Sequence, residues 1–191
     1  MSDSSMQGLS FYIETFGCQM NEQDSLRAGY HLAQAGCRRV SSPAEADILI
    51  VNTCSIRRKA EGKAYSLLGR FRTLKRKRPG VVVAVGGCVA QQEGPGLLER
   101  MPQVDVVFGP HHVSEIDRLV NRYRVEGERV AAVSQITDSV EDLECPGISD
   151  GKGLKAYVTI MEGCDNFCSY CVVPFVRGRE RSRPCRSLLE E

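Results

Sequence analysis

The 191-residue sequence contains no tryptophan, and aromatic residues make up only 6% of it. No run of apolar residues approaches the ~20 that a membrane-spanning helix needs, so we expect no membrane association. The N-terminus, MSDSSMQG, lacks the basic and apolar regions of a secretory signal, which predicts a cytoplasmic location. Disulfides are rare in that compartment, so we expect the nine cysteines to be free thiols or metal ligands.

Three cysteines lie close together near the C-terminal end, in the stretch GCDNFCSYC. Cys164, Cys168 and Cys171 have the spacing C-x3-C-x2-C. A closed tetrahedral zinc site needs four ligands, whereas three thiolates can hold three corners of an iron–sulfur cubane and leave the fourth iron open. The spacing therefore predicts a [4Fe–4S] cluster. The alternatives are a zinc knuckle without its fourth ligand and three unrelated buried cysteines.

Apolar strands alternate with amphipathic helices over residues 1–134, which predicts an α/β domain with a parallel sheet. The expected strands cover residues 9–16, 47–52, 81–85, 104–108 and 129–133. In the first helix, Asn21 is the expected N-cap. The residues expected on the buried face of that helix are Leu26, Gly29, Tyr30 and Ala33.

A cysteine follows each of the first three expected strands. These residues are Cys18, Cys54 and Cys88, at intervals of 36 and 34 residues. Crossover connections bring the ends of parallel strands to one edge of the sheet, where such sheets bind ligands. We therefore predict that the three thiols converge on a second metal or cluster site, the alternative being three small buried apolar residues. We interpret His111 and His112, after the fourth strand, as solvated capping or loop residues and not as ligands.

Charge is unevenly distributed, although the net charge is only +1. Residues 55–78 contain ten lysines and arginines and one acid, so this segment has a charge of +9 and the remainder −8. Such a segment predicts an acidic partner at one face. Acidic residues and glycines over 135–153 predict a linker. A strand over 154–161 and a helix from Ser187 then predict that residues 154–191 begin a second, incomplete domain.

Four stretches resemble the tRNA methylthiotransferases, a family of radical S-adenosylmethionine enzymes: FYIETFGCQMNEQDS, ILIVNTCSIRRKAEGKAYSLLGR, VGGC and MEGCDNFCSYCVVPFVRGRERSRP. The resemblance covers nearly the whole chain. It is most specific in residues 17–21 and 177–184, which resemble the branch that acts on isopentenylated adenosine next to the anticodon. The branches that act on threonylcarbamoyladenosine or on a ribosomal-protein aspartate tend to differ there, and their substrates are the alternatives.

The resemblance implies an N-terminal parallel-sheet methylthiotransferase domain followed by the start of a radical S-adenosylmethionine partial (β/α) barrel. It also implies two sets of ligands: Cys18, Cys54 and Cys88 for an auxiliary [4Fe–4S] cluster, and Cys164, Cys168 and Cys171 for the radical cluster. Tyr170 would pack near the adenine of S-adenosylmethionine. In this family a 5′-deoxyadenosyl radical takes hydrogen from C2 of the adenine. Sulfur is inserted through the auxiliary cluster, and a second S-adenosylmethionine supplies the methyl group.

By the same resemblance we expect a monomer whose partners are tRNA and an electron donor, either a reductase or a flavodoxin-like protein. The expected contacts to tRNA phosphates are Arg72, Lys75, Arg76, Lys77 and Arg78, with a solvated helix face as the alternative. Family members continue through the rest of the barrel, so we expect the 191-residue chain alone to bind S-adenosylmethionine weakly and to leave the reaction incomplete. The alternative function is a non-catalytic iron–sulfur or RNA-binding fragment.

Overall fold

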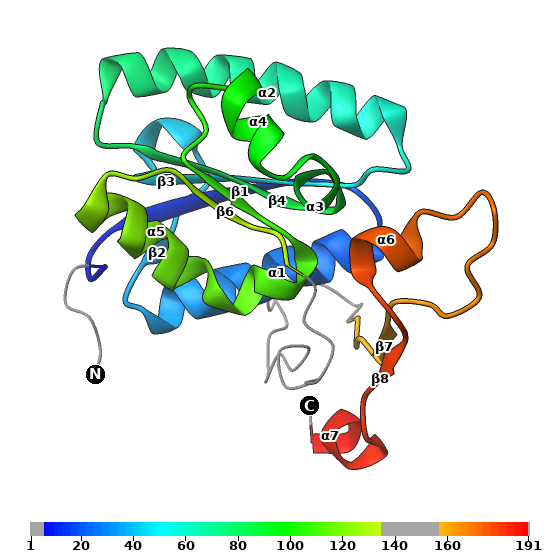
Figure 1. Cartoon of the computed structure of the whole chain (residues 1–191). Helices are drawn as coiled ribbons and strands as arrows, with labels where there is room; N and C mark the ends of the chain where they lie inside the picture. Colours follow the sequence, from blue (N-terminus) through cyan, green and yellow to red (C-terminus); the bar gives the residue numbers. More distant parts are fainter. Residues whose placement is uncertain (1–5, 135–156, 191) are drawn as a thin grey trace.

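A six-stranded sheet forms the centre of the fold (Figure 1), seen in a computed structural model that describes residues 6–134 and 157–190. Every neighbouring pair of strands is parallel, in the order β2-β1-β3-β4-β5-β6. The strands are β1 (Ser10–Phe16), β2 (Arg38–Arg39), β3 (Ile48–Thr53), β4 (Val82–Gly87), β5 (Val106–Phe108) and β6 (Val130–Ala132). The predicted parallel α/β fold is confirmed, and the linker predicted for 135–153 lies outside the described residues.

The central strands are buried on both faces, which explains their nearly continuous apolar sequence. All six residues of β3, ILIVNT, are buried. Ile48 and Ile50 join the hydrophobic cluster on one face of the sheet, whereas Leu49 and Val51 join the cluster on the other. This alternation is the two-residue period of a strand. The two-residue strand β2 extends the edge beside β1 and was not predicted from the sequence.

Helices cover both faces of the sheet, as Figure 1 shows. On one face, α1 (Gln19–Gln34) and α5 (Ile116–Glu126) contribute Leu32 and Val120 to the core. On the other face, α2 (Arg58–Lys77) and α4 (Pro95–Arg100) contribute Phe71 and Leu97. The remaining helices of this part are η1 (Pro43–Glu45), α3 (Cys88–Glu93) and η2 (Pro110–Glu115).

The start and the buried face of α1 differ from the sequence prediction. The N-cap is Cys18, and Asn21 stands in the first turn, where its Oδ1 accepts from the Cys18 N–H at 3.2 Å. The prediction of Leu26, Gly29, Tyr30 and Ala33 as the buried face was wrong, because the first three are half-buried and Ala33 is exposed. Polar residues, among them Asp24, are buried at the N-terminal half instead. That half faces other polar groups, which hydrophobic periodicity cannot detect.

The C-terminal segment rests against the sheet domain. It contains β7 (Met161–Glu162), α6 (Val173–Arg177), β8 (Arg181–Ser182) and α7 (Cys185–Glu190), and α6 packs against α3 and η2. Of the strand predicted over 154–161, the described part is in a strand only at Met161, because residues 157–160 are not in a strand. β7 pairs with β8 in antiparallel orientation. The expected start of a parallel barrel is therefore not visible among the described residues.

Candidate metal centre

Cys18, Cys54 and Cys88 leave the sheet at one level. Phe16 is paired in register with Thr53, and Thr53 with Gly87, so the next residues of the three strands emerge together. The strand order also reverses between β1 and β3, since the chain adds β2 on one side and then continues on the other. Such a reversal leaves a crevice at the carboxyl edge, which is where open α/β sheets bind ligands.

The three thiols interact at this crevice. The Cys54 thiol donates a hydrogen bond to Cys18, and Cys88 is near enough to raise the pKa of Cys54. These interactions bring the three strand-end cysteines into one neighbourhood, and the metal or cluster site itself stays a prediction. Within the described residues, no group of three or more His, Cys, Asp or Glu side chains has the arrangement of a site for a single metal ion.

Two glycines and two asparagines build the base of the crevice. A Cβ on Gly17 would lie 2.3 Å from Asn21 Oδ1, and one on Gly87, at φ +92°, would lie 2.3 Å from Asn52 Oδ1. The amide of Asn21 donates to Asn52 Oδ1 at 3.1 Å, and Asn52 Nδ2 donates to the Asn21 carbonyl at 2.8 Å. Sequence reasoning missed Asn52. The available signal was a polar residue at the end of an otherwise apolar strand.

The local hydrogen bonds favour one thiolate. The pKa of Cys18 is lowered to about 5, mainly by the hydrogen bond from Cys54 and further by backbone N–H groups and the Arg177 guanidinium. Donating that hydrogen bond raises the pKa of Cys54. Burial raises the pKa of Cys88, and Arg177 acts in the opposite direction. A cation near the thiols stabilises the charged form that metals bind.

The donor set suits an iron–sulfur cluster better than a single ion. Three thiols without a fourth protein ligand match a cubane with one open corner, whereas a structural zinc site closes with four ligands. Thr53 Oγ1 and Ser55 Oγ, on either side of Cys54, are buried and have no hydrogen-bond partner within the described part of the chain. Two buried hydroxyls without partners, next to Cys54 in the sequence, are consistent with a further group bound at this edge of the sheet.

A buried ion network joins the C-terminal segment to this crevice. Arg177 of α6 contacts Asp24 of α1 at 2.5 Å and Glu162 of β7 at 2.6 Å. The other oxygen of Glu162 accepts from Arg181 at 2.8 Å, and Arg181 also contacts His111 Nδ1 at 3.1 Å. Burial acts to raise the pKa of Glu162, but the surrounding cations, Arg177 foremost, hold it below its usual value. No pattern in the sequence indicated this network.

Both histidines after β5 are buried, so the interpretation of them as solvated loop residues was wrong. His111 is 1% exposed and belongs to the ion network. His112 is 7% exposed and contacts the Ser134 hydroxyl at 2.8 Å through Nε2. Their placement follows from η2, which turns back over the end of β5 and carries both rings inward.

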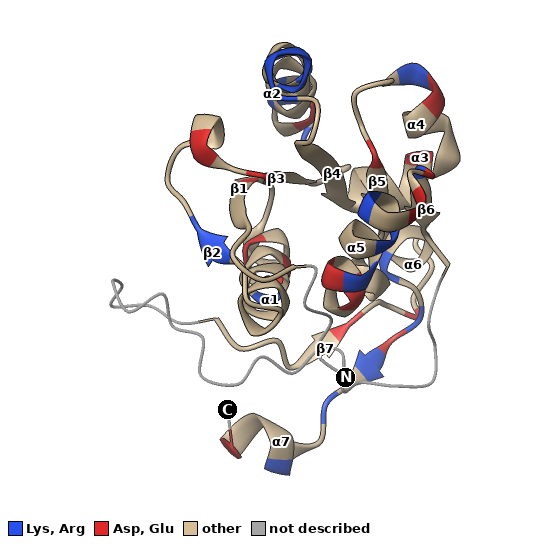
Figure 2. Cartoon of the chain, turned by 90° about the vertical axis from the view of Figure 1, so that its left-hand side faces the viewer, with Lys and Arg blue, Asp and Glu red and all other residues tan. Residues whose placement is uncertain are grey.

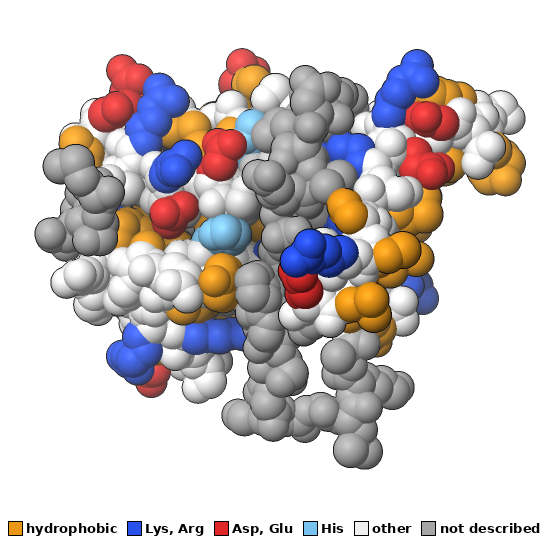
Figure 3. Space-filling view, turned by 90° about the horizontal axis from the view of Figure 1, so that it is seen from below, with side chains coloured by type: hydrophobic (Ala, Val, Ile, Leu, Met, Phe, Trp, Pro, Cys, Tyr) orange, Lys and Arg blue, Asp and Glu red, His pale blue; other side chains and the backbone are white. Residues whose placement is uncertain are grey.

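The second cysteine group lies on a loop that projects from the domain (Figure 1). Cys164 and Cys171 are half-buried, Cys168 is exposed and Tyr170 is 90% exposed. The base of the loop is closed by the Cys164 N–H, which donates to the Gly178 carbonyl at 3.2 Å. Figure 3 shows hydrophobic side chains along this side of the molecule; the exposed ones include Phe167, Tyr170 and Phe175.

The five cations predicted to contact tRNA lie at the end of α2, away from the cysteines. Arg72 is fourteen residues into this helix, roughly 20 Å from its start beside Cys54. Arg72, Arg76 and Lys77 are exposed, and Figure 2 shows α2 end-on with its lysines and arginines in blue. Lys75 and Arg78 instead form ion pairs with Asp105 and Asp47.

Cys37, Cys145 and Cys185 match no ligand position of the family that the sequence resembles, and we interpret them as structural or incidental. Cys37 is buried, and its thiol donates to the Met6 carbonyl at 3.4 Å. Cys185 is exposed in α7. Cys145 lies outside the described residues. The interpretation of these three cysteines as structural or incidental stays a prediction.

Comparison with known proteins places the sheet domain in a family. A family model described as "Uncharacterized protein family UPF0004" matches residues 10–109, which include the three strand-end cysteines. The chain belongs to the UPF0004 family. No helix among the described residues of this UPF0004 protein is long and apolar enough to cross a membrane.

Several curated relatives have the same name. A protein named tRNA-2-methylthio-N(6)-dimethylallyladenosine synthase from Geobacter metallireducens is 51% identical over 180 residues, and its namesake from Desulfosudis oleivorans is 47% identical over 184. The alignments cover 94% and 95% of this UPF0004 chain but only 40% and 39% of the relatives. The chain thus spans about two-fifths of their length. The resemblance to tRNA methylthiotransferases is confirmed over that span.

Proposed function

We propose that the chain is the cluster-binding part of an enzyme that methylthiolates C2 of N6-isopentenyladenosine next to the anticodon of tRNA. The observation that supports this most strongly is the convergence of Cys18, Cys54 and Cys88 at the switch point of a parallel sheet. The names of the relatives support the reaction and the substrate. The protein would work in the cytoplasm as a monomer, with tRNA and an electron donor, a reductase or flavodoxin-like protein, as partners.

Two groups of residues would hold the cofactors. Cys18, Cys54 and Cys88 would bind an auxiliary [4Fe–4S] cluster, and the loop of Cys164, Cys168 and Cys171 would bind a second one together with S-adenosylmethionine. When bound, these groups supply the radical and sulfur chemistry that no amino-acid side chain can supply. Tyr170, whose side chain is exposed, would pack against the adenine of S-adenosylmethionine.

The chain's own residues orient and insulate the auxiliary site. The hydrogen bonds between Asn21 and Asn52 fix the start of α1 against the end of β3, and so fix Cys18 beside Cys54. The buried Thr53 and Ser55 hydroxyls, which have no partner among the described residues, would be available to donate hydrogen bonds to a cluster held by Cys54. Arg177 brings a buried positive charge to the thiols, which offsets the negative charge of thiolate ligands. Because Arg177 follows Cys171 by six residues, it also ties the second loop to the first site.

A simple electron carrier is a weaker alternative. Such proteins hold each cluster with four cysteines, and each group here has three. An RNA-binding module without catalysis would leave the three strand-end thiols without a role. Both alternatives predict no change in tRNA nucleosides when the protein is lost.

Loss of the gene tests the proposal. Deletion in the host organism should remove 2-methylthio-N6-isopentenyladenosine from digested tRNA and leave N6-isopentenyladenosine to accumulate, as measured by mass spectrometry. Restoring the gene should restore the modification, whereas the variant with Cys18, Cys54 and Cys88 changed to alanine should not. An unchanged nucleoside profile would overturn the proposal. If only the derivatives of threonylcarbamoyladenosine are lost, the substrate is threonylcarbamoyladenosine and not N6-isopentenyladenosine.

A further inference from the structure

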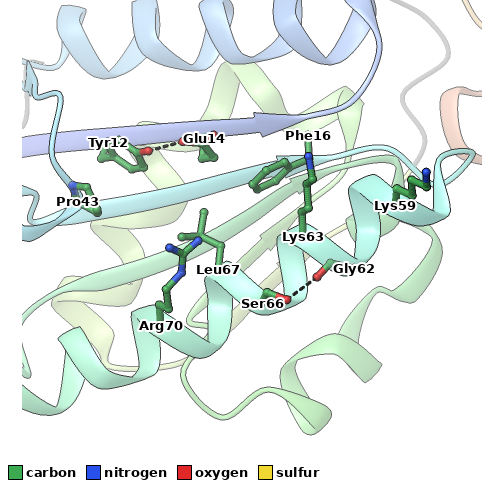
Figure 4. Close-up of a pocket in the computed structure, with 10 residues that line it drawn as sticks. All are labelled: Tyr12, Glu14, Phe16, Pro43, Lys59, Gly62, Lys63, Ser66, Leu67 and Arg70. Carbon is green, nitrogen blue, oxygen red and sulfur yellow. Dashed lines mark hydrogen bonds between the residues drawn. The ribbon is translucent and has the colours of Figure 1, made fainter.

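A groove of about 780 Å³ lies between α2 and the near face of β1 (Figure 4). It exists because the apolar face of α2 packs over the inner strands, where Leu67 and Phe71 meet Leu49 and Val83. β1, nearer the edge of the sheet, has only a half-buried surface on this side. The groove is lined by β1, η1 and α2.

Cationic and aromatic side chains line opposite walls of this groove. Lys59, Lys63 and Arg70 lie on one side of α2, at spacings of four and seven residues, and are exposed. None of the three forms an ion pair or hydrogen bond with another residue in the described part of the chain. Tyr12 and Phe16 come from β1, four residues apart and therefore on one face of the strand.

The groove leads toward the candidate metal centre. Phe16 is the last residue of β1 and stands two residues before Cys18, while Lys59 stands five residues after Cys54. From Lys59 to Arg70 the groove follows α2 for roughly 16 Å. A polymer lying along it would approach the cysteines at one end.

We propose that this groove binds a single-stranded segment of the RNA substrate, with phosphates at Lys59, Lys63 and Arg70 and a base against Phe16. Proteins that bind single strands combine a positive groove with aromatic platforms, because phosphates need cations and every base can stack. The inference rests on the proposed function, which supplies RNA as the partner. Among the lining residues, Glu14 is the acid, and its carboxylate accepts from the Tyr12 hydroxyl.

The same helix provides a matched comparison. Arg72, Arg76 and Lys77 are also exposed cations of α2 but do not line the groove. The test measures binding of an anticodon stem–loop RNA to the full chain at several salt concentrations. Changing Lys59, Lys63 and Arg70 to glutamine should reduce the slope of log affinity against log salt by about 2 to 3, since each phosphate contact contributes about 0.7–0.9. Arg72, Arg76 and Lys77 are also among the cations expected from the sequence to contact phosphates, but they stand outside the groove, so changing them to glutamine should reduce the slope less than the groove variant does.

Two glycines test the location without removing any cation. Gly62 lines the groove and Gly69 does not; both are exposed in α2, and an added Cβ at either meets nothing within 4 Å. Gly62→Glu should weaken RNA binding about ten-fold by placing a carboxylate among the phosphates, whereas Gly69→Glu should have a smaller effect. Both variants gain helix propensity, so both should fold. Phe16→Leu should weaken binding by roughly ten-fold without changing the salt slope.

The inference is overturned if the groove triple variant keeps the wild-type slope, or if both triple variants lose the same slope. It is also overturned if Gly62→Glu and Gly69→Glu bind RNA equally. These outcomes are separate from the test of the proposed function, which measures modified nucleosides in cells. If a groove variant binds RNA normally and tRNA is still modified, the groove proposal is wrong and the proposed function is unaffected. If a groove variant has a reduced slope but deletion of the gene leaves the tRNA nucleosides unchanged, the proposed reaction is wrong and the groove proposal is unaffected.

Discussion

The guanidinium of Arg177 contacts the carboxylate of Asp24 at 2.5 Å, across 153 residues of sequence. Asp24 lies in the first helix, six residues after Cys18, and Arg177 lies six residues after Cys171. The ion pair thus connects the segments that hold the two cysteine groups. Both side chains are nearly inaccessible to solvent, so their charges are neutralised by this pair together with Arg27 beside Asp24 and Glu162 beside Arg177.

Arg177→Met should therefore destabilise the packing of the C-terminal segment. The variant leaves Asp24 and Glu162 buried with fewer cationic partners, and breaking such a buried pair costs about 3–5 kcal/mol. We expect faster amide hydrogen exchange in residues 161–182, with smaller changes in the central strands. Arg179→Met is the matched control, because its side chain is 70% exposed. Equal exchange in the two variants would contradict a stabilising role for the network.

The sequence predicted the sheet and its cysteine edge because both follow from local patterns. Apolar runs marked β1, β3 and β4, and each was followed by a cysteine. The ion network was not predictable in this way. Asp24 and Arg177 are charged, and periodicity assigns charged residues to the surface unless a partner from a distant segment is known. The buried face of α1 was misjudged for the same reason.

The predicted RNA contacts at the end of α2 stay a prediction, and they illustrate what a sequence pattern leaves open. A run of cations indicates a charged surface but not which cations are free. Lys75 and Arg78 stand among the others in sequence, yet the fold uses both in ion pairs. Lys59 and Lys63, whose sequence context is less basic, line a groove instead. Only the arrangement of α2 over the sheet separates these two groups.

Lys75→Met should lower the stability of the fold more than the same substitution at the neighbouring cations Arg76 and Lys77. The Lys75 ammonium pairs with Asp105, whose side chain is 2% exposed and whose Oδ2 also accepts from the Val83 N–H at 2.9 Å. Removing the cation leaves a buried carboxylate with only uncharged donors, the Val83 N–H and the Tyr123 hydroxyl, which should cost about 2–3 kcal/mol in the free energy of unfolding. Chemical denaturation measures this value. Arg76→Met and Lys77→Met, at exposed positions, should change the free energy of unfolding by less than about 0.5 kcal/mol. A similar loss of stability in all three variants would refute a structural role specific to Lys75.

Asp47 should make stability depend on pH in the acid range. Partial burial acts to raise its pKa, but hydrogen bonds from Ser10 and the Arg78 guanidinium at 2.8 Å hold the pKa below its usual value. A carboxyl whose pKa is lower in the folded state stabilises the fold above its unfolded pKa, about 3.9, and loses this contribution as the pH falls through the folded value.

Asp47→Asn should therefore be less stable than the wild type near neutral pH by about 1 kcal/mol. The difference should shrink as the pH falls below about 4, because the wild-type carboxyl then becomes neutral as well. Thermal unfolding at several pH values measures it. Glu99→Gln, at an exposed position in α4, serves as the control and should show no such trend. A difference that is constant with pH would assign the effect to packing.

The cysteine groups predict the iron content of the protein. Two groups of three thiols should hold about eight irons per chain after anaerobic reconstitution, at four per cubane. Replacing either group with alanine should halve the iron, as measured by colorimetric assay together with the absorption spectrum.

The control for this measurement is the double variant Cys37→Ala and Cys185→Ala, which removes two described cysteines that belong to neither group. It should keep the full iron content. If either triple variant loses all its iron, the two cysteine groups share one site. We do not expect this result, because one group lies at the strand ends and the other on the projecting loop. If the variant without the strand-end cysteines keeps the full iron content, the predicted cluster site beside Asn21 and Asn52 does not exist. Uptake of one zinc and no iron would contradict both assignments.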